Sequence, residues 1–153
     1  MQSNVWSIPA MCMTPTANTV QENKYVTTAG RVKFKAGESG KIVFVASVSK
    51  SFPEGRYALR AHLERKVADL LGTNIQLRRA NRVNGAVETI LTCVGVQIDP
   101  VQNNIRFSDS NVENLKIDLD KFYYWIQVTD SNASPATKDS VDAVLGVSIV
   151  RIS

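Results

Sequence analysis

Few side chains in this sequence could do chemistry, and their spacing does not place them in a catalytic arrangement. His62 is the single histidine among the 153 residues, and it falls on the polar face of a run with strand periodicity. A hydrolase of the nucleophile-elbow type presents its serine in Gly-x-Ser-x-Gly, a motif that this sequence lacks. We therefore expect His62 to be a surface or cross-strand residue, and we expect no enzyme activity.

The two cysteines do not suggest a metal site either. Cys12 and Cys93 are far apart in the sequence, and with one histidine they argue against zinc, which needs clustered ligands. Whether they form a disulfide is left open by the sequence. Cys93 stands in the apolar run Ile90–Val94, which is typical of a small buried residue.

Four carboxylates are candidates for calcium. Asp118 and Asp120 share one face of an expected strand, where they could bind the ion together with Asp109 or Glu113. Carboxylates on the solvent face of a sheet are the commoner arrangement, and we adopt it. No glycine-rich loop followed by Lys-Ser or Lys-Thr is present to hold a phosphate. We accordingly predict no metal and no cofactor.

The aromatic run from Lys121 to Asp130 holds the best candidates for binding. Tyr123, Trp125 and Gln127 alternate, so on a strand they lie on one face, where a sugar ring could stack on Trp125. The other interpretation is that this face packs on another sheet or subunit, because Tyr and Trp are enriched at protein interfaces. We favour the packing interpretation. The alternate residues would then form the core face: Phe122, Tyr124, Ile126 and Val128.

Period-two runs fill the sequence from residue 24 onward, and they are what must position these side chains. The expected strands cover residues 31–35, 42–48, 56–64, 73–79, 86–98, 105–107, 115–119, 121–130 and 143–153. Eight or nine short strands without a βαβ repeat predict two antiparallel sheets packed face to face. The fold class is therefore all-β, an antiparallel Greek-key β-sandwich with jelly-roll character.

Residues 51–72 are ambiguous. Ser51-Phe-Pro-Glu54 fits a helix capping box, and leucines follow at helical spacing. Tyr57, Leu59, Ala61 and Leu63 also alternate with more polar residues, as on a half-buried strand. We favour a strand over 56–64 and a loop over 65–72, with the helix kept as the alternative. Further on, Asn84-Gly85 predicts a tight type I′ hairpin turn, in which both central residues need positive φ.

The closing run carries apolar residues on both faces. Ala143, Leu145, Val147 and Ile149 would line one face, and Val144, Gly146, Val150 and Ile152 the other. Because an antiparallel sheet commonly leaves one face wet, both faces of this strand require cover. Subunit packing or the N-terminal segment could supply it.

Residues 1–23 are predicted to form an extended N-terminal arm, followed by a single sandwich domain over 24–153. The arm lacks regular periodicity, and Trp6, Ile8 and Met11 are spaced apolar residues on a polar strip. Such residues could anchor the arm on a neighbouring subunit. A partly disordered terminus is the alternative.

Composition narrows the class of protein. The sequence is 44% hydrophobic and 21% charged, which is ordinary for a globular domain. A net charge of +4 without a long basic run favours solvated faces over a nucleic-acid footprint. Residues 1–7 have no signal-peptide character, and no stretch is long and apolar enough to span a membrane.

The order of these elements resembles small β-sandwich proteins of tailed-phage particles. The segments that carry the likeness are residues 68–78, with Leu-Gly before a strand, the aromatic strand 122–132 and the closing strand 145–150. The likeness covers residues 55–153 and rests on pattern. The family includes capsid decoration (cement) proteins, neck and baseplate parts and tail-fibre heads, and it implies no catalytic residues.

These observations lead to a hypothesis of a non-enzymatic virion structural protein. The resemblance implies a bacteriophage capsid decoration protein, assembled in the host cytoplasm and bound to the major capsid protein as a homotrimer, without nucleic acid or membrane. Its assembly contacts would be Trp6, Ile8, Met11, Tyr123 and Trp125. The alternative is a tail, baseplate or fibre-head module that recognises a receptor or glycan through Tyr123 and Trp125.

Overall fold

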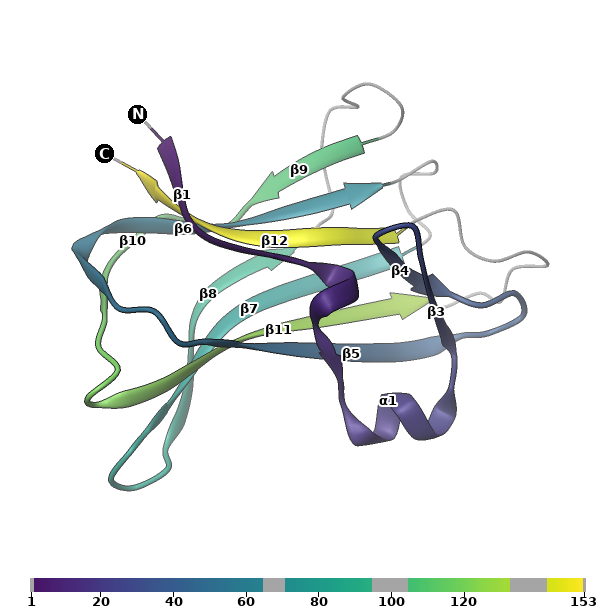
Figure 1. Ribbon diagram of the computed structural model, residues 1–153, viewed down its shortest axis with the longest axis horizontal. Helices are drawn as coiled ribbons and strands as arrows, with labels where there is room; N and C mark the ends of the chain where they lie inside the picture. The colour runs from purple at the N-terminus through teal and green to yellow at the C-terminus, as the bar shows by residue number, and fades with distance from the viewer. Residues whose placement is uncertain (1, 65–70, 95–104, 133–142, 153) are drawn as a thin grey trace.

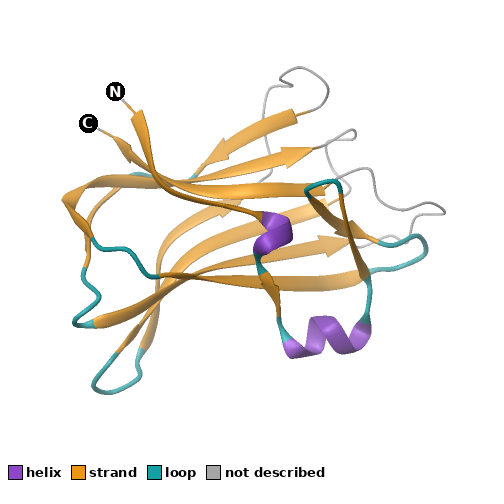
Figure 2. Ribbon diagram, viewed as in Figure 1, coloured by secondary structure: helices purple, strands orange, loops and turns teal. Residues whose placement is uncertain are grey.

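The computed structural model describes residues 2–64, 71–94, 105–132 and 143–152, and most of these residues are in strands (Figures 1 and 2). The strands are β1 (Gln2–Pro9), β2 (Thr14–Pro15), β3 (Tyr25–Thr28), β4 (Arg31–Phe34), β5 (Gly40–Val48), β6 (Phe52–Glu64), β7 (Leu71–Asn81), β8 (Val87–Val94), β9 (Ile105–Asp109), β10 (Glu113–Ile117), β11 (Phe122–Asn132) and β12 (Ala143–Ile152). A 3₁₀ turn, Ala10–Cys12, and one short helix, α1 (Ala17–Glu22), complete the described elements.

The strands form two antiparallel sheets. Sheet A has seven strands in the order β10-β6-β12-β4-β3, with β1 beside β12 and β9 beside β6. Sheet B has five strands in the order β2-β5-β11-β7-β8. The chain crosses between the sheets repeatedly, as from β5 to β6 and from β11 to β12, and the sheets lie face to face (Figure 1). The predicted all-β antiparallel sandwich is confirmed.

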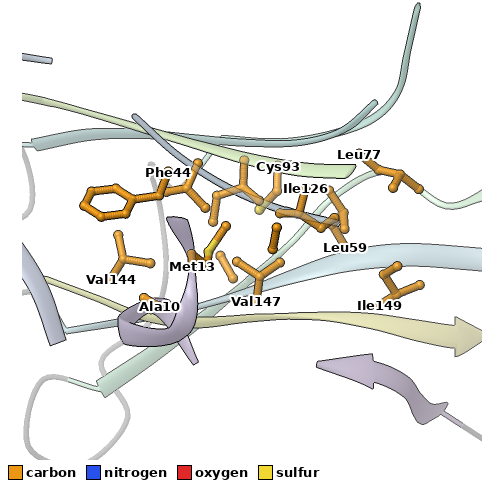
Figure 3. Close-up of a cluster of buried hydrophobic side chains, with 14 of the residues drawn as sticks. Ala10, Met13, Phe44, Leu59, Leu77, Cys93, Ile126, Val144, Val147 and Ile149 are labelled. Atoms are coloured by element: carbon orange, nitrogen blue, oxygen red, sulfur yellow. The ribbon is translucent and has the colours of Figure 1, made fainter. Parts of the chain in front are cut away.

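The core lies between the two sheets, and period-two alternation explains how it forms. In β5 the buried positions alternate with more exposed ones, so this strand presents Ile42, Phe44, Ala46 and Val48 inward. Leu59 of β6, Leu77 of β7 and Ile126 of β11 are fully buried against them (Figure 3). Burying a Leu or Ile side chain completely contributes about 1.5–3 kcal/mol, so this layer is the main source of stability.

The strand favoured over 56–64 is confirmed, since β6 runs from Phe52 to Glu64 and the helix alternative is wrong. Pro53, read as a helix start, instead accepts a 2.6 Å hydrogen bond at its carbonyl oxygen from the Tyr57 hydroxyl. Leu71 and Gly72, expected in a loop, begin β7. The rest of that loop (65–70) and the end of the strand expected over 86–98 lie outside the described residues.

The hairpin at Asn84-Gly85 differs from the prediction of a two-residue type I′ turn. The loop is four residues long, from Arg82 to Gly85, and only Gly85 has positive φ, at 72°. The Asn81 side-chain Oδ1 accepts hydrogen bonds from the backbone N–H groups of Val83 and Asn84. This side-chain cap stabilises a helical turn, which Gly85 closes in the left-handed region.

The N-terminal segment is part of the sandwich, which corrects the expectation that the domain begins at residue 24. β1 pairs with β12 from Gln2↔Ile152 to Pro9↔Gly146, and β2 pairs with β5. Ala10 and Met13 are buried in the core between the sheets (Figure 3). These strands, together with β3, raise the number among the described residues to twelve.

The assignment of faces on β12 also needs correction. A register shift between Val144 and Gly146 marks a β-bulge, and Val144 joins Val147 and Ile149 in the core. A bulge inserts one extra residue, which reverses the alternation beyond it. On the outer face Val150 lies opposite Ala58 and is fully buried within the single chain, so cover at this point does not depend on a partner subunit.

Candidate functional site

The outer face of sheet B carries the aromatic residues that the sequence analysis singled out. β11 is central in this sheet, between β5 and β7. Its inward residues Tyr124, Ile126 and Val128 are buried, so the alternate residues point away from the core. Tyr123 is 59% exposed and Trp125 is half-buried on this outer face, as predicted. We call Tyr123, Trp125 and Gln127 the aromatic platform.

Strand register decides which side chains flank Trp125. Arg78 of β7 lies opposite Trp125 on one side, and Ser47 of β5 lies opposite it on the other. The Arg78 guanidinium carbon is 5.8 Å from the Trp125 ring centroid, within the range of a cation–π contact. Ser47 is small and exposed, so the indole is not hidden from the β5 side.

Gln127 continues the platform with amide groups. Its paired residue on β7 is Gln76, and on β5 it is Val45. The Arg78 Nη1 donates to the Gln127 Oε1 at 3.5 Å, a weak contact, and the Arg78 Nε is buried without a hydrogen-bond partner. The platform thus combines aromatic faces with amide and guanidinium donors.

A hollow of about 210 Å³ lies at the Tyr123 end of the platform. It is lined by Ser47, Ser49, Arg82, Leu119 and Tyr123, among others. The Arg82 guanidinium carbon is 4.8 Å from the Tyr123 ring centroid, and its Nη1 donates to the Leu119 carbonyl oxygen at 2.7 Å. That bond fixes the arginine beside the ring, so it forms one wall of the hollow.

The residues under the platform hold β11 in place. Arg79 lies 3.9 Å from the Phe122 ring centroid and forms an ion pair with Glu88 across β7 and β8. The Tyr124 hydroxyl accepts a hydrogen bond from the Asp118 N–H at 3.2 Å and donates to the Lys116 carbonyl oxygen at 3.3 Å. These contacts link the start of β11 to the segment before it, which makes the platform a fixed surface.

His62 lies on the outer face of sheet A, far from the platform in the fold. Its ring stacks on Phe107 across β6 and β9 at 4.5 Å between centroids, so the prediction of a cross-strand residue is confirmed. Desolvation by burial lowers the pKa of His62 below its ordinary value. In the described part of the chain no hydrogen bond joins His62 to a serine or a carboxylate.

The carboxylates considered for calcium have other partners. Asp109 makes a two-pronged contact with Arg60, at 2.7 and 2.9 Å. Asp118 accepts a hydrogen bond at Oδ1 from the Asp120 N–H at 3.0 Å, which stabilises a turn. Within residues 2–64, 71–94, 105–132 and 143–152, no three His, Cys, Asp or Glu side chains are grouped to hold a metal ion.

The thiols do not pair. Cys12 is exposed and Cys93 is buried, and both are free. The Cys93 Sγ donates to the Ser108 carbonyl oxygen at 3.2 Å, and burial raises the pKa of this thiol. Cys93 is therefore the small buried residue that the sequence indicated.

The N-terminal candidates are not brought together with the platform. Trp6 lies opposite Ile149 and Ile8 opposite Val147 in sheet A, and both side chains are half-buried against the molecule's own core. Met11 is 51% exposed. Trp6 and Ile8 therefore already make apolar contacts within the chain.

The arginines and Ser47 were not among the residues predicted from the sequence. The basic residues were assigned only to solvated faces, yet Arg78, Arg79 and Arg82 each lie over an aromatic ring. Finding this requires the pairing of β7 with β11. The one signal available was that Arg78 alternates with the inward residues Ile75 and Leu77, which places it on the outer face.

Comparison with known proteins gave no family model that matches this chain. No curated protein matches it either. No helix in the described residues is long and apolar enough to cross a membrane.

Three solved structures are similar at low scores. A xylan-binding module, CBM15, matches with a TM-score of 0.41 and 12% identity, over 84% of this chain and 82% of that one. TmCBM61, solved in complex with β-1,4-galactotriose, matches with a TM-score of 0.35 and 13% identity, over 99% and 85%. TmCBM27, a carbohydrate-binding module with specific mannan recognition, matches with a TM-score of 0.41 and 8% identity, over 99% and 89%. At these values we base no argument about this chain on the likeness.

Proposed function

We propose that this chain is a non-catalytic binding module that recognises a glycan through the aromatic platform of sheet B. The observation that carries the proposal is Tyr123, 59% exposed beside Trp125 on the central strand of that sheet. Tyr and Trp each combine an apolar ring with a polar tip, and two such rings on one face form a stacking surface. Sugars present apolar C–H faces that suit such a surface.

The groups around the rings suit a sugar as well. Hydroxyl groups around a pyranose need donors and acceptors, and Gln127, Gln76 and Arg78 supply both kinds beside Trp125. The platform also lies on a strand paired on both sides, which keeps its rings and amides in fixed positions.

A binding role without catalysis agrees with where the titratable groups lie. The single histidine is on sheet A, stacked on Phe107, and the platform has no histidine or cysteine. An acid–base reaction on a sugar needs two carboxyl groups facing each other across the bond. The outward side chains of β5, β7 and β11 include no carboxylate.

A glycan array tests the proposal. The wild-type protein should bind a defined set of glycans, and Trp125→Ala should weaken that binding by about tenfold or more, which corresponds to at least about 1.4 kcal/mol. Tyr123→Ala should weaken it as well. Thermal unfolding of each variant checks that the sheet is retained.

Phe107→Ala is the matched control, because Phe107 is also an exposed aromatic residue, 46% accessible, but lies on sheet A. It should leave glycan binding unchanged. An array on which the wild-type protein binds nothing, or on which Phe107→Ala and Trp125→Ala behave alike, would contradict the proposal.

Assembly on a virion, with the major capsid protein as partner and a homotrimer as the unit, stays a prediction. Nothing in the single chain favours it over the binding module, because Trp6 and Ile8 pack against their own core. Light scattering of the purified chain measures the oligomeric state on which the trimer depends.

A further inference from the structure

We infer that the glycan bound at the platform is acidic, with carboxylate or sulfate groups on its sugar rings. This inference rests on the proposed function and names its ligand class. It is drawn from the two arginines that flank the aromatic rings, Arg78 beside Trp125 and Arg82 beside Tyr123.

These two arginines differ from the three arginines that have a carboxylate partner. Arg31, Arg60 and Arg79 form ion pairs with Glu64, Asp109 and Glu88. Within the described residues, Arg78 and Arg82 form none, although both are held next to rings on one face. A guanidinium that is fixed in place without a counter-charge is ready to accept an anionic group from outside the chain.

Arg78 shows the need for an acceptor most directly. Its Nε is buried and makes no hydrogen bond, and its Nη1 reaches Gln127 only at 3.5 Å. The guanidinium therefore keeps hydrogen-bonding capacity that the described residues do not use. Carboxylate and sulfate oxygens match the fork of a guanidinium, and a sugar stacked on Trp125 would bring such oxygens to it.

The outward side chains of the three central strands of sheet B do not offset these charges. No outward-facing side chain of β5, β7 or β11 is acidic, and Glu88 across β7 and β8 is paired with Arg79. The ligand would therefore meet a positive face with two charges at separate points, one along Trp125 and one at the hollow beside Tyr123.

Isolated charges among amides favour an acidic glycan over a nucleic acid. A single strand carries one phosphate per nucleotide and is bound in a continuous basic groove. On the outer face of β7, the residues that precede Arg78 along the strand are Gln76 and Asn74, which are uncharged. Amides suit the hydroxyl groups that lie between charges on a sugar chain.

The test compares pairs of polymers that share a backbone and differ in charge. Polygalacturonate is measured against its methyl-esterified form, and dextran sulfate against dextran, by isothermal titration calorimetry at one salt concentration. We expect at least one acidic polymer to bind about tenfold or more tightly than its neutral partner, and the pair that shows the preference identifies carboxylate or sulfate.

Three variants assign the preference to the platform. Arg78→Gln and Arg82→Gln should each remove most of the preference for the acidic polymer, while Trp125→Ala should weaken the binding of both polymers of a pair. Arg56→Gln is the control, because Arg56 is exposed on sheet A and its loss changes the net charge by the same amount. Arg82 lies in the exposed loop, so Arg82→Gln remains informative if Arg78→Gln destabilises the sheet.

The outcomes separate this inference from the proposed function. Equal binding of neutral and acidic polymers, abolished by Trp125→Ala, would overturn the inference and keep the binding module. Equal effects of Arg56→Gln and Arg78→Gln would show that the preference reflects net charge alone, and would overturn the inference. Tighter binding of an oligothymidylate than of the acidic polymers would overturn it as well. No binding to any polymer, together with an empty array, would overturn both.

Discussion

At the residue scale, His62 illustrates how a group with catalytic potential serves the fold instead. It stacks on Phe107 at the side of β6 that carries β9, and the Arg60–Asp109 ion pair lies two register positions away. Burial of the ring disfavours its charged form, which is why the pKa of His62 is lowered. The stack is therefore most stable while the imidazole is neutral.

This arrangement predicts lower stability in mild acid. Because the folded pKa lies below the ordinary value of 6.5, the unfolded chain takes up the proton first as the pH falls. The contribution of His62 is complete above about pH 6.5 and is lost as the pH falls toward its folded pKa. The free energy of unfolding in urea should therefore drop between about pH 7.5 and about pH 5.5.

His62→Phe is the comparison for this prediction, because it keeps a ring on Phe107 and removes the titration. The variant should lose less stability than the wild type over the same pH interval. Identical pH dependence in the two proteins would show that His62 does not contribute. As His62 is the single histidine, no second imidazole obscures the difference.

At the element scale, β12 is where the two halves of sheet A meet. It pairs with β6 along one side and with β1 along the other. Gly146 sits where β1 comes closest: a Cβ added there would lie 2.9 Å from the Ile8 carbonyl oxygen. Real Cβ atoms do not come this close to a backbone atom, so the pairing of β1 requires glycine at this position.

Gly146→Ala should therefore destabilise the protein by about 1–3 kcal/mol, through overpacking of β1 against β12. Thermal or urea unfolding measures the effect. Gly72→Ala is the control, since its added Cβ would meet only the Ser131 Cβ at 3.9 Å, an ordinary contact. Equal stability of the two variants would contradict the role given to Gly146.

The inward and outward faces of some strands could be predicted from the sequence and those of others could not, for physical reasons. Alternation predicted the faces of β5 and β11 because neither strand contains a bulge, so Tyr123 and Trp125 were placed together on the outer face. It failed on β12, where the bulge reverses the alternation after Val144. Side-chain capping by Asn81 likewise replaced the expected two-residue turn.

The arginines beside the aromatic rings could not be predicted from the sequence, for a related reason. Which β7 residue meets Trp125 depends on pairing across long separations, and one residue of slip would exchange Arg78 for its neighbour on the other face. The aromatic half of the platform lies within one strand and was predictable. The arginine half comes from other segments and was not.

At the scale of the whole molecule, the first residues of the chain belong to both sheets. β1 completes sheet A along β12, β2 extends sheet B along β5, and the segment between them buries Ala10 and Met13. The sequence predicted the sandwich from its regular strands but not this segment. Its apolar residues show no period, because they enter the core from a strand, a turn and a bridging segment in succession.

Deleting residues 2–13 should therefore abolish the cooperative unfolding transition seen by circular dichroism. The deletion removes a strand of sheet A and opens the core at Met13, where truncation of a buried methionine alone costs about 2–5 kcal/mol. That approaches the whole stability of a small domain, about 5–15 kcal/mol. Met11→Ser, at an exposed position, should leave the transition unchanged.

A truncated protein that melts like the wild type would contradict this assignment. It would restore the view that residues 1–23 are an arm separable from the domain.

The pairing of Gln2 with Ile152 has a practical consequence for engineering the molecule. It brings the two ends of the described chain side by side on sheet A (Figure 1), while the aromatic platform lies on the outer face of the other sheet. Neighbouring ends suit circular permutation and insertion into a surface loop of a host protein. A label or host attached at either end would leave the aromatic surface free, so the module can be displayed without blocking the face that we propose binds.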